Sequence, residues 1–222
     1  REKLTVFPLY FDVDIKLTVA TLGEGADTKV VGPVWDPTEV EREVIDEENG
    51  FRFFKVIAKI LAIVFPETSL EMFLYSATGK TGPLSSKVSF RLVFPSIVVD
   101  KDRAVIVREF LVQKLFNLSR EESTVPFIRS FQKQLLTYSS SNHYRNVIDE
   151  TAIRCRHGVR MIFNDKIEKG KPAGRVFLPL FTLVPEMVDQ TIAKLEKNVS
   201  DRDDLVWLQK GSLVTPSLSH AE

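Results

Sequence analysis

Two carboxylates separated by a single residue stand near the start of the chain. Asp12 and Asp14 lie in a stretch rich in β-branched and aromatic residues, which predicts a strand over residues 4–16, interrupted near its start by Pro8. Because successive side chains of a strand point to opposite faces, both carboxylates share one face and Val13 points to the other. Carboxylates this close repel each other unless a cation lies between them, and oxygen ligands suit Mg²⁺ or Mn²⁺. The spacing therefore predicts a site for a divalent metal.

A second alternating segment carries the opposite charge. Lys87, Ser89 and Arg91 fall on one face of a predicted strand, and Val88 and Phe90 fall on the other. Ammonium, hydroxyl and guanidinium groups in a row suit phosphate oxygens, and Arg can bind them bidentately. This segment therefore predicts a phosphate-binding face.

A third cluster supplies another carboxylate. Asp149 follows the apolar pair 147–148, and Arg160 and Lys166 stand near the ends of a later apolar run. Each cluster by itself also fits an exposed strand face, a turn or ordinary surface charges. Their conjunction in one order favours a site for a divalent metal and a nucleoside triphosphate.

This order of motifs resembles the archaeo-eukaryotic primase superfamily, and within it the PrimPol-like primase-polymerases. Members carry an Asp-x-Asp or Asp-x-Glu motif that closes a strand, a Ser-x-His motif with Lys two residues before it, and a hydrophobic-Asp motif followed by Arg and Lys. The matching segments are residues 9–14, residues 87–91, and residues 147–149 with Arg160 and Lys166. The resemblance covers most of the chain, from residue 9 to about residue 166.

The resemblance implies an α/β (α+β) fold, in which a mixed, mainly antiparallel sheet flanked by helices forms an RRM-like primase catalytic core. It implies a template-dependent DNA polymerase or primase-polymerase that adds dNTPs or NTPs to a primer by two-metal nucleotidyl transfer, with damage-tolerant replication as one setting. The expected partners are primer-template or single-stranded DNA. We expect the catalytic domain to span residues 1–214. Residues 215–222 lack a packing pattern and are expected to be a disordered tail.

The resemblance also assigns roles to the motif residues. The three acids would hold two Mg²⁺ or Mn²⁺ ions, so replacing Asp12 or Asp149 by Ala is expected to abolish nucleotide incorporation while leaving the fold intact. The triphosphate would be held by five residues: Lys87, Ser89, Arg91, Arg160 and Lys166.

The second motif departs from the family at one position. The family has His where this chain has Arg91, and His157-Gly158 replaces the polar pair that commonly precedes the Arg of the third motif. Arg can make the phosphate contact of that His with a permanent charge, so we expect nucleotide binding to be retained. Priming from two free nucleotides is expected to demand more of this pocket than extension does.

Two other readings stay open. A nucleotide-sugar transferase also uses Asp-x-Asp with Mn²⁺, although the basic ladder argues against it. A primase-like domain that binds nucleic acid without catalysis is the second, and the three retained acids argue against that one. The segment 78–81 lacks the earlier Gly of a phosphate-binding P-loop, and a single Cys gives no paired spacing for a structural zinc site.

Composition fits an intracellular enzyme core. The 222 residues are 44% hydrophobic, enough for a sizeable core, and 30 basic and 30 acidic residues balance. The lone Cys fits a reducing compartment, which is the nucleus or mitochondrion in a eukaryote and otherwise the cytoplasm. No run of about 18 apolar residues is present, so we expect no membrane partner. The metal motif lies so near the start that we expect an excised catalytic region, or one without the small module that precedes the motif in relatives. Nothing in the pattern points to an oligomeric state.

The remaining pattern predicts alternating helices and strands. The segment Thr38 to Glu41 has the form of a capping box, and Asp100 or Asp102 is a candidate cap for a later helix. Helices are expected over residues 38–48, 51–65, 102–118, 126–138 and 186–197. Further strands are expected over residues 70–75, 88–94, 147–155, 159–163 and 175–180, with a hairpin at His157-Gly158. Loops or turns are expected over residues 77–86, 139–142 and 166–171.

Overall fold

A computed structural model gives the fold of the chain. It describes residues 6–22, 29–120, 126–154, 163, 165–168, 171–189, 191–198 and 207, without the side chains of residues 165–168 and 171–173. The expected tail at residues 215–222, the expected hairpin at His157-Gly158 and all but Phe163 of the expected strand at 159–163 lie outside the described residues.

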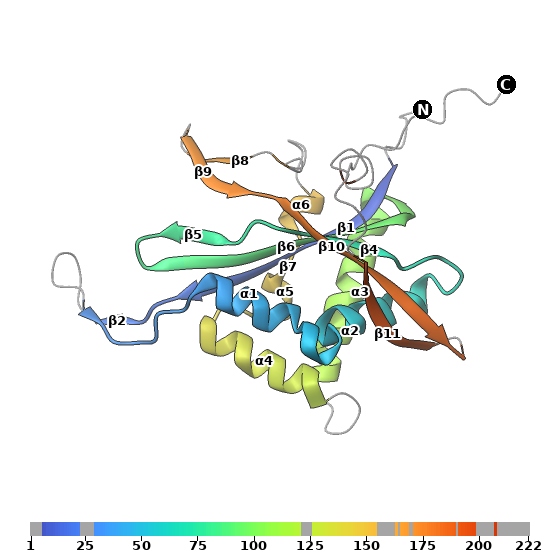
Figure 1. The fold of residues 1–222 in the computed structure, drawn as a ribbon, viewed down its shortest axis with the longest axis horizontal. Helices are drawn as coiled ribbons and strands as arrows, with labels where there is room; N and C mark the ends of the chain where they lie inside the picture. The colour runs from blue at the N-terminus through green and yellow to red at the C-terminus, as the bar shows by residue number, and fades with distance from the viewer. Residues whose placement is uncertain are drawn as a thin grey trace.

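An antiparallel sheet forms the centre of the structure (Figure 1). Its strands follow the order β11-β10-β4-β6-β1-β7, with β5 paired to β6, and every described pairing is antiparallel. The expectation of a mainly antiparallel sheet flanked by helices is therefore confirmed. The strands are β1 (Val6–Thr18), β4 (Met72–Ser76), β5 (Gly79–Gly82), β6 (Ser85–Asp100), β7 (Ile148–Asp149), β10 (Leu178–Val188) and β11 (Thr191–Asn198). Two small ladders pair β2 (Thr21–Leu22) with β3 (Lys29–Val30) and β8 (Asp165–Glu168) with β9 (Lys171–Val176).

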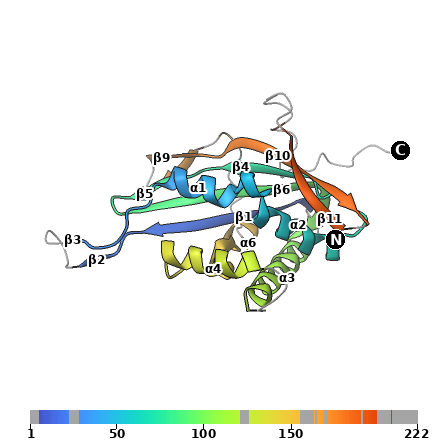
Figure 2. The ribbon, with the colours of Figure 1, turned by 60° about the horizontal axis from the view of Figure 1, so that its bottom comes forward.

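Helices cover one face of this sheet. Figure 2 shows α2, α3 and α4 together beneath the sheet. The helical elements are α1 (Pro37–Ile45), the 3₁₀ turn η2 (Glu47–Asn49), α2 (Arg52–Val64), α3 (Lys101–Arg120), α4 (Pro126–Tyr138) and the one-turn α5 (Tyr144–Val147) and α6 (Thr151–Arg154). The expected helices at 51–65, 102–118 and 126–138 are confirmed as α2, α3 and α4. Asp100 caps α3, because its Oδ1 accepts a hydrogen bond from the Arg103 N–H at 2.8 Å.

The core lies between the sheet and the helices. The long ladder of β1 with β6 sets Val13 opposite Phe90 and Ile15 opposite Val88, and all four side chains are fully buried. The Phe90 ring meets Phe54 of α2 edge-on at 5.8 Å between centroids. The alternation of polar and apolar residues in β1 and β6 thus places the apolar residues of both strands against the helices.

Strand β1 is completed on its outer side by a loop. The ladder shifts register between Pro8 and Leu9, as expected for a Pro near the start of a strand. Beyond the two-residue β7, the side-chain amide of the buried Asn142 pairs with the backbone of β1. Its Oδ1 accepts a hydrogen bond from the Lys16 N–H at 3.0 Å, and its Nδ2 donates to the Lys16 carbonyl at 2.8 Å. The loop expected at residues 139–142 is confirmed and has this structural role.

The expected start of the first helix was wrong by two residues. The N-cap of α1 is Asp36, whose Oδ1 accepts from the Thr38 N–H at 2.8 Å, and Pro37 occupies the first turn. A Pro at that position is preorganised for a helix start, which moves the boundary ahead of the expected capping box. The helix also ends at Ile45, and Asp46 adopts a left-handed conformation with φ of 54°.

The expected strand at residues 147–155 was wrong except near its start. Of the described residues 147–154, only Ile148 and Asp149 form a strand, between α5 and α6. The Asp149 Oδ1 accepts from the Thr151 N–H at 2.9 Å, so the side chain turns the backbone out of the sheet.

Four other expectations fail where residues pair as strands. Residues 186–188 belong to β10 and residues 191–197 to β11, although Ile192 and Leu195 are buried at a helical spacing of three. Pairing of β10 with β11 overrides that local pattern. The expected loop at 77–86 contains β5. The expected turn at 166–171 has residues 166–168 in β8 and Lys171 in β9, and residues 169–170 lie outside the described residues. The expected strand at 175–180 divides into the end of β9 and the start of β10.

Among the described residues, no helix is both long enough and apolar enough to cross a membrane.

Candidate functional site

Residues from each of the three sequence clusters meet on the face of the sheet opposite the helix-packed core. The strand register sets Asp12 opposite Arg91 on one side and opposite Asp149 on the other, and it sets Asp14 opposite Ser89. Tyr75 of β4 continues the same row beyond Arg91. These residues form one polar row across β7, β1, β6 and β4. The four strands are neighbours in the sheet (Figure 1).

The centre of the row is a buried ion pair. Arg91 donates from Nε to Asp12 Oδ1 at 2.7 Å and from Nη2 to Asp12 Oδ2 at 2.8 Å. The two residues are 3% and 8% exposed, so both oxygens of the carboxylate are engaged inside the protein. Burial alone would lower the pKa of the Arg91 guanidinium, but the charge of Asp12 and its hydrogen bonds outweigh burial, and the pKa lies above its ordinary value. Arg91 therefore carries a positive charge.

Two aromatic rings flank the Arg91 guanidinium. Its carbon lies 4.5 Å from the ring centroid of Phe177 and 5.4 Å from that of Tyr10. Aromatic faces attract cations, and more strongly where water is excluded. The rings thus favour a cation here whichever anion it binds.

Asp14 is also held by residues of the basic ladder. Its Oδ1 accepts from the Ser89 hydroxyl at 2.5 Å, and its Oδ2 lies 2.5 Å from the Lys87 ammonium. Burial raises the pKa of the Asp14 carboxyl above its ordinary value, and Lys87 and Ser89 offset that rise only in part. The negative charge of Asp14 therefore depends on its neighbours.

Asp149 is less engaged than the other two acids. It is partly exposed, and its Oδ1 accepts from the Thr151 N–H at the start of α6. The Tyr10 hydroxyl donates to the Ala152 carbonyl at 2.8 Å, which ties α6 to β1. Strand pairing on one side and this tie on the other hold Asp149 beside Asp12.

Two predicted phosphate-binding residues stay untested. Arg160 lies outside the described residues, and Lys166 is described only by its backbone, which is part of β8. The structure thus brings together Asp12, Asp14, Asp149, Lys87, Ser89 and Arg91.

The sequence analysis missed a buried cation that supports the site. Arg108 of α3 is 1% exposed and donates to the Ile148 carbonyl from Nε at 3.0 Å and from Nη2 at 2.5 Å. It also donates to the Arg145 carbonyl. Because Ile148 precedes Asp149, this guanidinium fixes the short strand that carries the third acid. The signal was an Arg within the apolar stripe of α3, next to Val107, where a charge needs partners.

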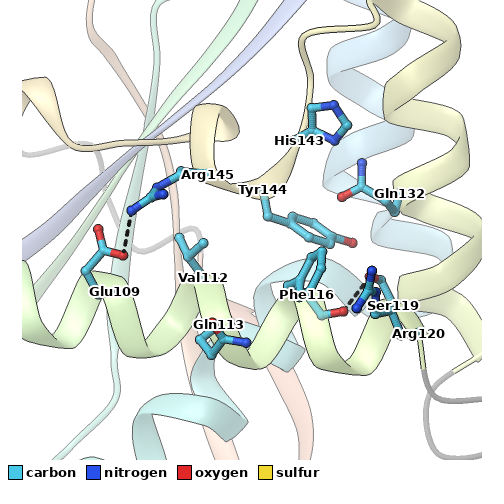
Figure 3. A pocket seen from close by; sticks show the side chains of 10 residues that line it. All are labelled: Glu109, Val112, Gln113, Phe116, Ser119, Arg120, Gln132, His143, Tyr144 and Arg145. Carbon is cyan, nitrogen blue, oxygen red and sulfur yellow. Dashed lines mark hydrogen bonds and ion pairs between the residues drawn. The ribbon is translucent and has the colours of Figure 1, made fainter.

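Figure 3 shows the outer side of this junction between α3 and α5. The Arg145 guanidinium lies 3.5 Å from Glu109, whose other oxygen pairs with Arg108 at 2.6 Å. An open cavity of about 400 Å³ lies beside them, lined also by Phe116 and His143. None of the six assembled site residues lines this cavity, so it is a separate feature of the helical layer.

The donor atoms of the polar row can be compared with those that a divalent metal ion requires. Three carboxylates are the donors that Mg²⁺ and Mn²⁺ prefer, so the donor chemistry fits. Yet among the described residues no group of three or more His, Cys, Asp or Glu side chains is arranged to hold a metal ion. The carboxylate oxygens of Asp12 and Asp14 contact Arg91, Ser89 and Lys87, so they are not directed toward a shared metal position. The arrangement is that of acids neutralised by side-chain cations.

No family model matches the chain, and no curated protein matches it.

Proposed function

We propose that the chain is the catalytic domain of a primase-polymerase-like nucleotidyltransferase, which adds nucleotides to a primer on a nucleic-acid template. The observation that carries the proposal is the polar row, in which three acids adjoin Lys87, Ser89 and Arg91 from distant segments on one face of an antiparallel sheet. An acid cluster next to Lys and Arg is the combination that phosphoryl chemistry needs, because charge must be neutralised on both the triphosphate and the leaving pyrophosphate. An RRM-like primase core is part of this proposal.

The residues of the polar row would have different roles. Asp12, Asp14 and Asp149 would hold two Mg²⁺ or Mn²⁺ ions, which neutralise phosphate charge and lower the pKa of the primer 3′ hydroxyl. Lys87 and Arg91 would bind the phosphate oxygens, and the rigid β1–β6 ladder would align the α-phosphorus with the attacking hydroxyl. Arg108 would act at a distance, by holding the strand that carries Asp149. The 3′ hydroxyl would lose its proton to water, and its oxygen would form a bond to the α-phosphorus as the bond to the leaving pyrophosphate breaks.

One observation favours a second candidate, a primase-like domain that binds nucleic acid without catalysis. Both oxygens of Asp12 are occupied by the permanently charged Arg91, where the family has His. If Arg91 never releases Asp12, the acids of the polar row would only stabilise the fold.

Primer extension separates the two candidates. A labelled primer on a DNA template is incubated with dNTPs and either Mg²⁺ or Mn²⁺, and products are resolved by length. We expect extension by the wild-type chain and a loss of about a thousandfold in Asp149→Asn, because this change removes a ligand charge while retaining the side-chain size.

The matched control is Lys59→Gln, an exposed change on α2, which covers the other face of the sheet. Equal extension by wild type and Asp149→Asn would remove Asp149 from the reaction. Retained DNA binding by fluorescence anisotropy, with no extension in either metal, would favour the non-catalytic domain. An unprimed template in the same assay tests priming.

A further inference from the structure

The open cavity beside α3 lies in the helical layer, away from the polar row (Figure 3). On α3 its lining residues recur every three or four positions from Glu109 to Arg120, so they share one face of that helix. The opposite wall is formed by Gln132 of α4 and by the residues that begin α5. A volume of about 400 Å³ is within the range of pockets that hold ligands.

Planar side chains with exposed surface border this cavity. The Phe116 ring is 44% exposed, and the Arg120 guanidinium lies over it at 4.4 Å from the ring centroid. His143 is also exposed, and its side chain makes no hydrogen bond that caps α5. Nucleobases stack on aromatic rings and on guanidinium planes. The cavity therefore offers stacking surfaces for a flat aromatic group.

The charge at the cavity is positive. Glu109 is the one acid among the described residues that line it, and its two oxygens contact Arg108 at 2.6 Å and Arg145 at 3.5 Å. Arg108 is buried, so Glu109 keeps that partner, whereas the side chain of Arg145 is 72% exposed and can turn to another anion. With Arg120, three guanidinium groups accompany one carboxylate. An anionic ligand would balance this excess.

The two exposed cations are far apart. Figure 3 shows Arg145 at one end of the cavity and Arg120 at the other, with Phe116 between them. Arg145 pairs with Glu109, which is separated from Arg120 by about 16 Å along the axis of α3 at the ordinary helical rise. A free mononucleotide carries phosphate at one end only, whereas a strand carries phosphate on both sides of each base. The spacing therefore favours a strand.

We infer that this cavity binds single-stranded nucleic acid, with one base stacked on Phe116 and the flanking phosphates held by Arg120 and Arg145. Cations that follow the backbone and rings that stack the bases are the combination by which proteins hold single strands. The bases of a duplex are stacked on one another, so only an unpaired strand offers a base to the cavity. Binding here requires neither the polar row nor nucleotidyl transfer.

Fluorescence anisotropy with a short labelled oligothymidylate measures this binding. We expect Phe116→Ala to weaken it about tenfold, because the stacked base loses its ring. The matched control is Ile106→Ala, which removes an exposed apolar side chain from the same helix outside the cavity and is expected to bind as the wild type does. Equal affinity of Phe116→Ala and wild type would overturn the inference.

The salt dependence of the same binding tests the cations. For a single strand, the logarithm of the association constant falls with the logarithm of salt concentration by about 0.7 per phosphate contact. We expect Arg145→Gln to reduce this slope by about 0.7 and Phe116→Ala to leave it unchanged. Arg129→Gln removes an exposed Arg of α4 outside the cavity and is expected to change neither slope nor affinity. Equal effects of the two Arg variants would show binding by general charge and overturn the inference.

Photocrosslinking locates the base. A strand that carries 5-iodouracil is irradiated with the chain, and the crosslinked peptides are identified by mass spectrometry. We expect crosslinks at Phe116 or at the neighbouring His143, and we expect them also in Asp149→Asn, which separates this site from primer extension. Crosslinks confined to Tyr10 and Phe177, the rings beside Arg91, would overturn the inference whether or not the chain extends primers.

Two competitors define the ligand. Polyglutamate offers the charge without bases, and thymidine monophosphate offers one base without a strand. We expect neither to displace the oligothymidylate at an equal concentration of residues or nucleotides. Displacement by either would overturn the inference, in favour of an acidic peptide or a free nucleotide. Circular dichroism shows whether each variant is folded, and the exposed change Arg145→Gln decides the matter if Phe116→Ala is not.

Discussion

The two faces of the β1–β6 ladder share one backbone and are buried to a similar degree, but their side chains differ in chemical type. On one face Val13 and Phe90 are fully buried against helices, and on the other Asp12 and Arg91 are almost as deeply buried but form an ion pair. The residues alternate along the same two strands, one position apart. Burial by itself therefore does not distinguish the core from the candidate site; the type of partner does.

The comparison separates two sources of specificity. Apolar side chains stabilise the fold by losing contact with water, which requires volume and shape but no particular partner. Buried charges cost free energy unless a matched charge lies within hydrogen-bond distance, so each one specifies its neighbour. The apolar face should tolerate substitutions that conserve volume, whereas the polar face should respond to changes of charge.

The largest effect is expected on the apolar face. Phe90→Ala removes a fully buried ring that contacts Phe54 and is expected to lower the free energy of unfolding by about 4 kcal/mol. Urea denaturation followed by tryptophan fluorescence measures it. The matched change one position earlier, Ser89→Ala, should cost about 1 kcal/mol because Asp14 keeps its pair with Lys87. Equal losses would contradict the division between the faces.

A slightly smaller effect is expected when the buried pair is broken. Asp12→Ala leaves Arg91 buried without its carboxylate and should lower the free energy of unfolding by about 3 kcal/mol. This revises the expectation that Asp12→Ala leaves the fold intact. The double variant Asp12→Ala with Arg91→Met should lose much less than the sum of the single changes, because neither charge is then stranded. Additive losses would show that the pair has no coupling.

Asp149→Ala gives the contrast within the same row. Asp149 has no side-chain cation among the contacts of the described residues, and its bond to the Thr151 N–H is that of a local turn. We therefore expect this change to cost about 1 kcal/mol in stability while incorporation is lost.

The smallest effect is expected at an acid on the helix-covered side. Glu41 of α1 lies near Ser76 and Thr78, and in the described part of the chain its Oε1 has no hydrogen-bond partner. Burial raises the pKa of its carboxyl above the ordinary 4.5, and the two hydroxyl groups lower it only in part. The folded chain thus binds more protons than the unfolded one above that pH, so stability falls as the pH rises through the raised pKa.

Glu41→Gln should remove this pH dependence. We expect the free energy of unfolding to rise by about 1 kcal/mol at neutral pH and to be unchanged below the ordinary pKa, measured by urea denaturation at both pH values. A variant less stable than wild type at neutral pH would show that the charged form of Glu41 is stabilised in the fold.

Elements with strong periodicity were predictable from the sequence. The segments that became α2, α3 and α4 carry long apolar stripes, and β1 alternates over enough residues to exclude a helix. Where the pattern is short, tertiary pairing decided the structure. Residues 186–188 and 191–197 have a helical spacing of apolar residues but form strands, because β10 and β11 pair with each other.

The candidate site was also predictable only in part. A period of two places Asp12 with Asp14, and Lys87 with Arg91, each on one strand face, and the order of motifs suggested that these groups meet. No local pattern indicated the role of Arg108 in holding Ile148, because that contact joins α3 to a two-residue strand 40 residues later. Nor did any local pattern indicate that the acids would be bound by the cations directly.

The sequence by itself determined which residues share a strand face, since alternation follows from the geometry of an extended backbone. The tertiary structure alone decided the register between strands, which sets Arg91 against Asp12 and Ser89 against Asp14. Register depends on the sum of many weak contacts across the sheet, and a shift of one residue would exchange the two faces of a strand. That sum is a property of the packed molecule, and it makes the polar row a set of ion pairs.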